Sequence, residues 1–409
     1  MTRYDVVVLG LTRAGAAVAD AAAAAGKKVA VVRFPDSDDY ADHLCYALEE
    51  APRPPEGPVR FEILTGPAAF ISSGTLSVGG ADISAPRFVL TPGARPRFPD
   101  GLDGVPLSTP LEVLSALPGR RLNAVVLGGG PVAVVVAERL RAAGGAVTIA
   151  ARSPRLLMRE DEIISDVLAG HLRARGIAIN LGISGLAVSP RDGGRHVRFC
   201  CGGDNREAQV DVIVAATGVA PALEGLALDK AGVLLHDGRV VVNDEMQTSN
   251  PRIYAAGHSV EPGAALAVQD HQAEIASANL TAPFWARRRM EPGESPFCLR
   301  SATPVARVGL TEGQARKKYR DVVVSMAPYF EPHGSEGAPG MIKLVGRRRH
   351  ARLLGAHVVG LGAAELILFF DLLVRSEIAI PDVPDRRHFP LPGPSDAAFR
   401  ALTAWAAAG

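Results

Sequence analysis

The chain opens with an unbroken apolar run, Val6-Val7-Val8-Leu9. A run without polar alternation is typical of a strand that is buried on both faces. A glycine turn at residues 10–15 follows, then an Ala- and Val-rich segment to about Ala25, and then a second apolar run, Val29–Val32. This order predicts a β-α-β unit whose turn leads into a helix N-terminus. The N–H groups and the dipole at such an N-terminus favour a dinucleotide pyrophosphate.

The first glycine turn departs from the usual fingerprint at two positions. It keeps Gly10 and Gly15, but Thr12 stands where a middle glycine would let the phosphates approach closely. Arg33 stands where an acidic residue would accept hydrogen bonds from the ribose hydroxyls. The motif alone therefore leaves two interpretations open, a nucleotide site and a structural turn.

A second unit of the same kind begins with the apolar run Ala124–Leu127. The residues that follow, Gly128-Gly129-Gly130-Pro131-Val132-Ala133, match G-x-G-x-x-A. A helix to about Ala143 and a strand at Val147–Ala150 complete the unit. Because the glycines fall between a strand and a helix, we expect a dinucleotide site here.

The residues after the second unit bear on the choice of nucleotide. The acidic residue that would select NAD is absent, and Arg152 and Arg155 stand where a 2′-phosphate would lie. Arginine recognises phosphate through its planar set of donors. The pattern favours NADP(H) over NAD(H), and the alternative is that both arginines belong to a solvated loop.

Composition narrows the classes of function. The formal net charge is +1 and aromatic residues make up 5% of the chain, so no nucleic-acid surface is expected. No apolar run reaches the about 18 residues of a membrane span, and the first strand begins without a signal-peptide pattern. We expect a cytoplasmic protein that binds neither nucleic acid nor membrane.

The four cysteines are Cys45, Cys200, Cys201 and Cys298. None forms a C-x-x-C spacing, and Cys200 and Cys201 would point to opposite faces of a strand. Reduced thiols in a cytosolic protein are the expectation, and no metal site is expected.

Further segments make the likeness to one family recognisable. They are Phe88–Pro96, Val212–Gly218, Thr248–Gly257, Val305–Glu312 and Leu354–Gly360. In this order they resemble a strand and turn of an FAD domain, the turn that leaves an NAD(P) domain, the returning FAD-domain strand, and a dimerisation domain. The chain thus resembles the pyridine nucleotide–disulfide oxidoreductases, which include dihydrolipoamide dehydrogenase, glutathione reductase and mercuric reductase.

The resemblance implies an α/β fold with two Rossmann-like nucleotide-binding domains, one inserted in the other, and a C-terminal α+β dimerisation domain. The expected FAD-type domain comprises residues 1–115 and 219–290, the NAD(P)-type domain 116–218, and the dimerisation domain 291–409. A homodimer, bound FAD and NADP(H), and a small-molecule substrate follow from the same likeness.

The resemblance also assigns cofactor-binding residues. On the FAD side these are Gly10, Thr12, Gly15, Arg33, Gly93, Gly257 and His258. His258 replaces an aspartate that usually contacts the ribityl and phosphate part of FAD. On the NAD(P) side they are Gly128, Gly130, Ala133, Arg152, Arg155 and Gly218. No residue receives a catalytic role.

Three features of the family are missing from the sequence. The family relays electrons through a C-x-x-x-x-C pair near the start of the chain, but the shortened segment between Arg33 and the turn after residue 90 holds only Cys45. Leu391 occupies the position of a C-terminal histidine base, and His388 lies three residues upstream. Val135 replaces a glutamate near the nicotinamide. A role for Cys45 or His388 is left open.

Two functions therefore remain. The favoured one is an NAD(P)H-linked, flavin-type oxidoreductase that acts on a small molecule without a disulfide relay. The alternative is a non-catalytic, dimeric scaffold or ligand-binding relative that has lost FAD and disulfide reductase activity. The sequence does not name the substrate or its pathway.

The remaining patterns predict structure. Apolar spacing predicts a helix over residues 266–280 and an Ala-rich helix over 396–408. The run Arg347–His350 is expected in a hairpin turn, and Arg287–Arg289 in the linker to the last domain, both as solvated charge.

Overall fold

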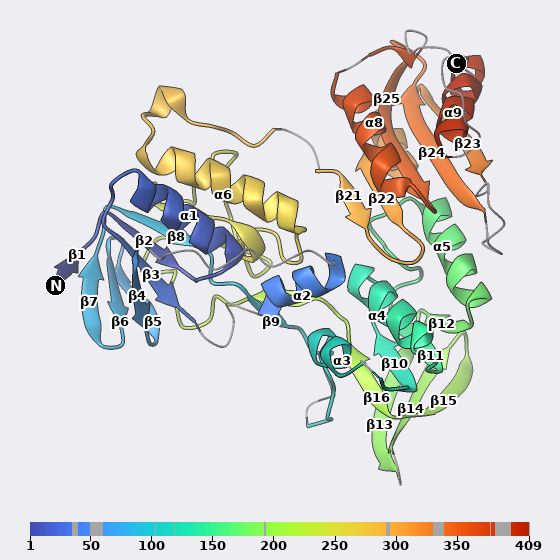
Figure 1. Cartoon of the computed structure of the whole chain (residues 1–409), viewed down its shortest axis with the longest axis horizontal. Helices are drawn as coiled ribbons and strands as arrows, with labels where there is room; N and C mark the ends of the chain where they lie inside the picture. Colours follow the sequence, from blue (N-terminus) through green and yellow to red (C-terminus); the bar gives the residue numbers. More distant parts are fainter. Residues whose placement is uncertain are drawn as a thin grey trace. The chain divides into compact units, whose positions relative to one another are not determined.

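The structure is a computed structural model of the chain. It describes residues 1–34, 40–49, 60–102, 104–117, 119–191, 194–291, 295–329, 339–376, 378–380 and 394–408. Two compact units are present, residues 1–98 with 218–292 and residues 99–217 with 293–409 (Figure 1). Both are α/β in composition, which confirms the expected fold class. The finer domain boundaries at residues 115, 218 and 290 stay a prediction.

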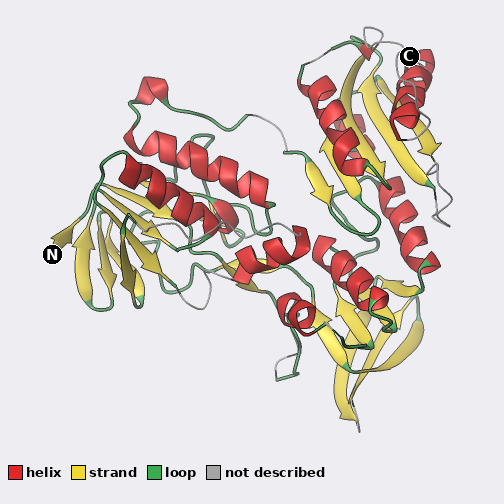
Figure 2. Ribbon diagram, in the orientation of Figure 1, coloured by secondary structure: helices red, strands yellow, loops and turns green. Residues whose placement is uncertain are grey.

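A parallel sheet of five strands forms the centre of the first unit, in the order β20-β8-β2-β3-β4. Its strands are β2 (Val6–Leu9), β3 (Val29–Arg33), β4 (Glu62–Thr65), β8 (Arg87–Leu90) and β20 (Ile253–Ala255). Helices α1 (Arg13–Ala24) and α6 (Leu266–Thr281) lie side by side (Figure 2). A second sheet, β1-β7-β6-β5, consists of β1 (Thr2–Arg3), β7 (Ala81–Ser84), β6 (Thr75–Val78) and β5 (Ala68–Ser72).

The side chains of β2 explain why its sequence has no polar position. Val6 and Val8 share a core with residues of α1 and α6. Val7 and Leu9 point the other way and share a core with residues of the second sheet. Because both faces are covered, all four side chains are buried. The predicted β-α-β unit is confirmed.

Short elements complete the first unit. They are α2 (Tyr40–Glu49), the 3₁₀ helices η1 (Gly257–Ser259) and η2 (Phe284–Ala286), and two antiparallel pairs, β9 (Ala94–Pro96) with β17 (Val219–Pro221) and β18 (Leu235–His236) with β19 (Arg239–Val240). The predicted helix over 266–280 is α6.

The second unit contains its own parallel sheet, in the order β12-β11-β10-β16. The strands are β10 (Ala124–Leu127), β11 (Val147–Ala151), β12 (Ile177–Leu181) and β16 (Val212–Ala215). The helices of this part are α3 (Pro110–Ala116), α4 (Pro131–Ala142) and α5 (Glu162–Ala174), and an antiparallel sheet follows, made of β13 (Ser184–Arg191), β14 (Gly194–Cys201) and β15 (Asp204–Val210). The second predicted β-α-β unit is thereby confirmed.

The C-terminal part of this unit is an antiparallel sheet in the order β21-β22-β25-β24-β23. Its strands are β21 (Phe297–Leu299), β22 (Val305–Gly309), β23 (Val322–Tyr329), β24 (Gly340–Arg347) and β25 (Arg352–Val359), with helices α7 (Glu312–Lys318), α8 (Ala363–Arg375) and α9 (Pro394–Ala408). Residues of α8 and α9 share one core with the sheet. The predicted hairpin turn after residue 347 and the predicted C-terminal helix are both confirmed.

Three polar side chains form a row across this C-terminal sheet. Arg307, His357 and Lys343 are neighbours on β22, β25 and β24, and all three are buried. The row meets two buried acids that precede α5. Arg307 Nε lies 3.2 Å from Glu160, and Lys343 Nζ lies 2.8 Å from Asp161. Buried ion pairs thus join the nucleotide-type and C-terminal parts of the second unit.

Candidate dinucleotide-binding sites

The first candidate site is the turn between β2 and α1. Gly10 has a φ of +115°, and a Cβ there would lie 1.9 Å from the Thr91 carbonyl oxygen. A Cβ on Gly15 would lie 2.0 Å from the Gly10 carbonyl oxygen. Both glycines are therefore required by the close approach of backbone to backbone. Thr12 is the N-cap of α1, and its Oγ1 accepts from the Gly15 N–H at 3.1 Å.

The start of α1 also meets a carboxylate from a distant part of the chain. The N–H of Arg13, the first residue of the helix, donates to Asp42 Oδ2 at 2.6 Å. Asp42 belongs to α2 and is 6% exposed. The Arg13 side chain makes two hydrogen bonds of 2.7 Å to Asp270 on α6. Sequence reasoning missed the contact to Asp42, because a separation of 29 residues carries no local signal.

The other residues predicted on the FAD side lie at the ends of neighbouring strands. Arg33 ends β3 and is exposed. Gly93, which follows β8, and Gly257, which follows β20, have φ values of +74° and +71°. His258 is buried, and burial lowers its pKa from 6.5 to about 4. It is therefore neutral near pH 7 and supplies no positive charge to a phosphate.

The second candidate site is the turn between β10 and α4. Gly128 has a φ of +127°, and a Cβ there would lie 2.3 Å from the Ala216 carbonyl oxygen. A Cβ on Gly130 would meet nothing within 4 Å, so space is open beside the start of the helix. Gly130 is the N-cap of α4 and makes no side-chain cap. Ala133, in the first turn, is fully buried. Unlike α1, α4 begins with no side chain capping its N-terminal N–H groups.

The arginines predicted for the NADP(H) phosphate follow β11. Arg152 is exposed, whereas Arg155 is half-buried and one of its terminal nitrogens donates to the Met158 carbonyl oxygen at 3.2 Å. Its Nε is buried and has no hydrogen-bond partner among the described residues. A buried guanidinium N–H without a partner is costly, so this donor suits a ligand oxygen. Gly218, the last residue predicted on this side, has a φ of +100° and accepts from the Arg97 N–H, and both residues lie in the first unit.

Of the four residues compared above with the family's redox, base and nicotinamide positions, Cys45 and Val135 are among the described residues, and each lies on a helix. Cys45 lies on α2, with its Sγ 4.0 Å from the Ala264 carbonyl oxygen. Val135 is buried within α4. His388 and Leu391 lie outside the described residues.

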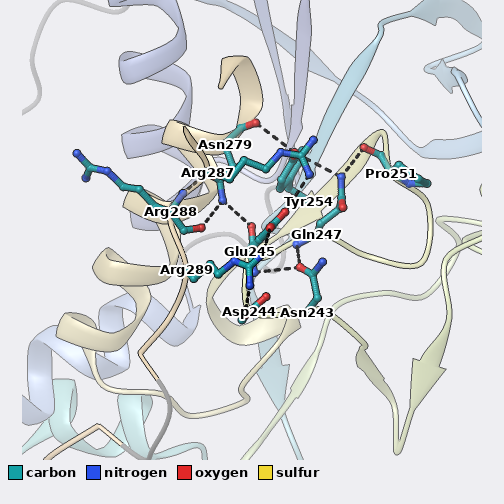
Figure 3. A network of polar contacts seen from close by, with 10 residues as sticks. All are labelled: Asn243, Asp244, Glu245, Gln247, Pro251, Tyr254, Asn279, Arg287, Arg288 and Arg289. Atoms are coloured by element: carbon teal, nitrogen blue, oxygen red, sulfur yellow. Dashed lines mark hydrogen bonds and ion pairs between the residues drawn. The ribbon is translucent and has the colours of Figure 1, made fainter. Parts of the chain in front are cut away.

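The arginine run after α6 is not a solvated charge run throughout (Figure 3). Arg287 and Arg289 reach the two oxygens of Glu245 at 2.9 and 3.1 Å, and the Arg288 N–H donates to Asn279 Oδ1 at 2.8 Å. The Arg287 side chain is only 20% exposed, and its hydrogen bond lowers the pKa of Glu245. The expectation of solvated charge is wrong for Arg287, because a buried carboxylate attracts it. Through these contacts, residues 287–289 connect the end of α6 to the turn before β20.

Two glycine turns, each between a buried parallel strand and a helix N-terminus, define a class of protein with two dinucleotide sites. Comparison with known proteins names the family. Residues 4–276 match the pyridine nucleotide-disulphide oxidoreductase model, and residues 295–396 match the dimerisation domain of the same family. The chain belongs to the pyridine nucleotide-disulphide oxidoreductases, and the predicted resemblance is confirmed.

Relatives and solved structures agree with this assignment. The chain is 29% identical to mercuric reductase of Staphylococcus aureus over 80% of its own length and 60% of the relative's. It is 30% identical to dihydrolipoyl dehydrogenase of Thermus scotoductus, over 79% and 71%. The fold matches the HOCl-induced flavoprotein disulfide reductase RclA from Escherichia coli, in a Cu(II) complex, with a TM-score of 0.81 and 22% identity over 99% and 100% of the two chains. The chain spans 60% and 52% of the lengths of the mercuric reductases of S. aureus and Bacillus cereus.

Members of this family depend on FAD and NAD(P)H. The second turn fits NAD(P)H, because α4 has no side-chain cap and Arg155 presents a buried donor that has no partner among the described residues. The first turn fits a dinucleotide in its backbone, since Gly10 and Gly15 shape the approach to α1. One N–H at the start of α1 is held by Asp42 instead. Each turn therefore suits its cofactor, but the FAD-type turn has a competing group.

Two absences hold for the part of the chain that the structure describes. No helix there has both the length and the apolar character needed to cross a membrane. No three His, Cys, Asp or Glu side chains come together there in a way that could hold a metal ion.

Proposed function

We propose that the chain is an NADPH-dependent, flavin-linked oxidoreductase that reduces a small molecule without a disulfide relay. The observation that carries this proposal is the second turn, where the N-terminus of α4 has no side-chain cap. A Cβ on Gly129 of this turn would lie 3.6 Å from the Arg155 carbonyl oxygen, and the buried Nε of Arg155 has no hydrogen-bond partner among the described residues. Helix N–H groups suit the pyrophosphate, and an arginine suits the 2′-phosphate of NADPH. Family membership supports the same cofactors.

The chain's own residues supply binding and electrostatics in this proposal. A bound FAD would supply the redox chemistry that links NADPH to an acceptor. Gly128 and Gly130 let the nicotinamide dinucleotide approach α4, while Arg152 and Arg155 select its phosphate. Gly10, Gly15, Gly93 and Gly257 would shape the path of FAD. Cys45 has no second cysteine at the C-x-x-x-x-C spacing, so we assign it no relay.

The acceptor is proposed as a class only. The relatives named above include mercuric reductases and a dihydrolipoyl dehydrogenase, and in this chain Cys45 has no second cysteine at the C-x-x-x-x-C spacing. A small acceptor that takes electrons directly from the flavin fits this combination. A cytoplasmic location belongs to the same proposal.

A homodimer is also proposed, through the family's dimerisation domain. Exposed leucines support it, since Leu361, Leu368 and Leu372 are 55%, 68% and 61% exposed at and just before α8. Leu368 and Leu372 are four residues apart within α8, so these two share one face of the helix. Apolar side chains this exposed suit an interface with a second copy.

Two observations favour the alternative, a non-catalytic relative. Asp42 occupies an N–H where FAD would bind, and His258 is neutral. A chain that had lost FAD could keep its fold with such internal contacts. The two candidates differ in whether purified protein takes up FAD.

Spectroscopy separates them. For the oxidoreductase, protein incubated with FAD and freed of excess is yellow, absorbs at about 450 nm, and is bleached by NADPH without oxygen. Colourless protein after this treatment contradicts the proposal.

A matched pair of variants tests the nucleotide site. Arg155→Met is expected to raise the Kd for NADPH about tenfold and leave NADH unchanged, whereas Arg173→Met, an equal charge change on exposed α5 surface, changes neither. An unchanged NADPH Kd in Arg155→Met argues against the phosphate contact.

A further inference from the structure

Two hydrogen bonds join the N-terminus of α1 to α2. The Arg13 N–H donates to Asp42 Oδ2 at 2.6 Å, and an Arg13 terminal nitrogen donates to the Tyr46 hydroxyl at 3.1 Å. The guanidinium also lies 5.8 Å from the centre of the Tyr46 ring. Asp42 is 6% exposed, so its carboxylate is withdrawn from water. A charge-assisted hydrogen bond in such surroundings is stronger than one at an open surface.

The Arg13 N–H is also one of the N–H groups at the start of α1 that would bind a dinucleotide. In a β-α-β unit, the pyrophosphate lies against the first N–H groups of the helix that follows the glycine turn. Arg13 is the first residue of α1, directly after the N-cap Thr12. One N–H cannot donate fully to a carboxylate and to a phosphate, and two anions this close repel each other. Asp42 and a pyrophosphate therefore exclude each other from this position.

The charges around Arg13 strengthen this competition. Its guanidinium is held by both oxygens of Asp270 at 2.7 Å, so the cation is already neutralised. Asp42 adds a second carboxylate beside the same residue. The second unit differs, because α4 begins with no side-chain cap and Arg155 keeps an unpartnered donor. The Asp42 carboxylate at the start of α1 thus distinguishes the FAD-type turn from the NAD(P)-type turn.

We propose that Asp42 lowers the affinity of the first unit for FAD. Its carboxylate holds the N-terminus of α1 against α2 until the pyrophosphate displaces the carboxylate from the Arg13 N–H. The inference rests on the proposed function, in which this unit takes FAD. Binding then breaks the contacts of Arg13 to Asp42 and Tyr46, while the Arg13–Asp270 pair stays. Asp42 therefore stabilises the flavin-free protein and disfavours the protein with FAD bound.

The test is a titration of FAD into flavin-free protein, followed by the quenching of flavin fluorescence, which needs no substrate or activity. The variants are Asp42→Ala, Asp42→Asn, which keeps a neutral acceptor, and Asp20→Asn, which removes an exposed charge elsewhere on α1. The expected Kd for FAD falls about tenfold in Asp42→Ala, falls less in Asp42→Asn, and is unchanged in Asp20→Asn. Without FAD, Asp42→Ala is expected to melt about 2–4 °C lower than wild type, because a helix cap is lost.

Opposite signs in the two measurements, tighter FAD and a less stable flavin-free protein, support the inference. Equal FAD affinities in wild type and both Asp42 variants overturn it and leave the proposed function standing. Weaker FAD binding in Asp42→Ala also overturns it, because Asp42 would then be a ligand of the cofactor. If none of the four proteins binds FAD while all melt cooperatively, the proposed function fails and the inference fails with it.

Discussion

The charged row across the C-terminal sheet yields a prediction whose size can be worked from the structure. Lys343 Nζ lies 2.8 Å from Asp161 Oδ1 and 2.6 Å from Glu312 Oε2. Its side chain is 7% exposed and that of Asp161 is 3% exposed. We consider the substitution Lys343→Met, which keeps an unbranched side chain one atom shorter and removes the charge. In the variant Asp161 stays buried, and the Glu312 N–H still donates to its Oδ2 at 3.1 Å.

Removing one partner of a buried ion pair typically costs about 3–5 kcal/mol, because the remaining charge is left in a medium of low polarity. The Glu312 contact adds little, since that side chain is 29% exposed and water screens it. We therefore expect the free energy of unfolding of the second unit to fall by about 3 kcal/mol. The control is Arg316→Met, since Arg316 pairs with the same Glu312 at 2.7 Å but is 55% exposed. Its expected loss is about 0.5 kcal/mol.

Urea unfolding followed by tryptophan fluorescence can report on this unit. The chain has two tryptophans. Trp405 is 1% exposed in α9, whereas Trp285 is 75% exposed in the first unit. The shift of emission on unfolding therefore comes mainly from Trp405. Similar midpoints for Lys343→Met and Arg316→Met would refute the argument that burial makes the difference.

The stability of Lys343→Met at low pH tests the same prediction in a second way. Burial raises the pKa of Asp161, but the hydrogen bonds from Lys343 and the Glu312 N–H outweigh it and hold the pKa below 3.8. Because the folded-state pKa is lowered, this stabilisation is present above the unfolded pKa and is lost as the pH falls through the folded one. Without Lys343, the pKa of Asp161 rises. The variant should then lose stability to acid at a higher pH than wild type.

Three further predictions concern other parts of the chain. Gly355→Ala should prevent stable folding, because the new Cβ would lie 2.1 Å from the Leu310 carbonyl oxygen, whereas Gly170→Ala, with nothing within 4 Å, should keep the melting temperature or raise it; equal melting temperatures would contradict this. Leu372→Glu should convert the proposed dimer to monomer in sedimentation experiments, and an unchanged mass would count against the α8 face. His258→Asn should reduce the loss of stability between pH 6.5 and about 4, since only the unfolded chain protonates this histidine there; an unchanged pH slope would show that other groups dominate.

Much of the fold could be predicted from the sequence because its signals are local. The runs Val6–Leu9 and Ala124–Leu127 are apolar at every position, and this pattern arises when a strand is covered on both faces. Gly10 and Gly128 mark the turns because their positive φ values favour a residue without a Cβ. Strand, turn and helix start lie within about ten residues, so neighbours along the chain suffice to predict them.

The sites depended on contacts that no local pattern contains. Arg155 is notable for its buried Nε and His258 for its neutral ring, and both properties come from burial in the folded chain. The row of Arg307, His357 and Lys343 exists only once three strands are in register. The sequence by itself thus determined the family, the α/β class and the two glycine turns. Only the tertiary structure decided that α2 brings Asp42 to the start of α1, because an anion binds a helix N-terminus through space, whatever its distance along the chain.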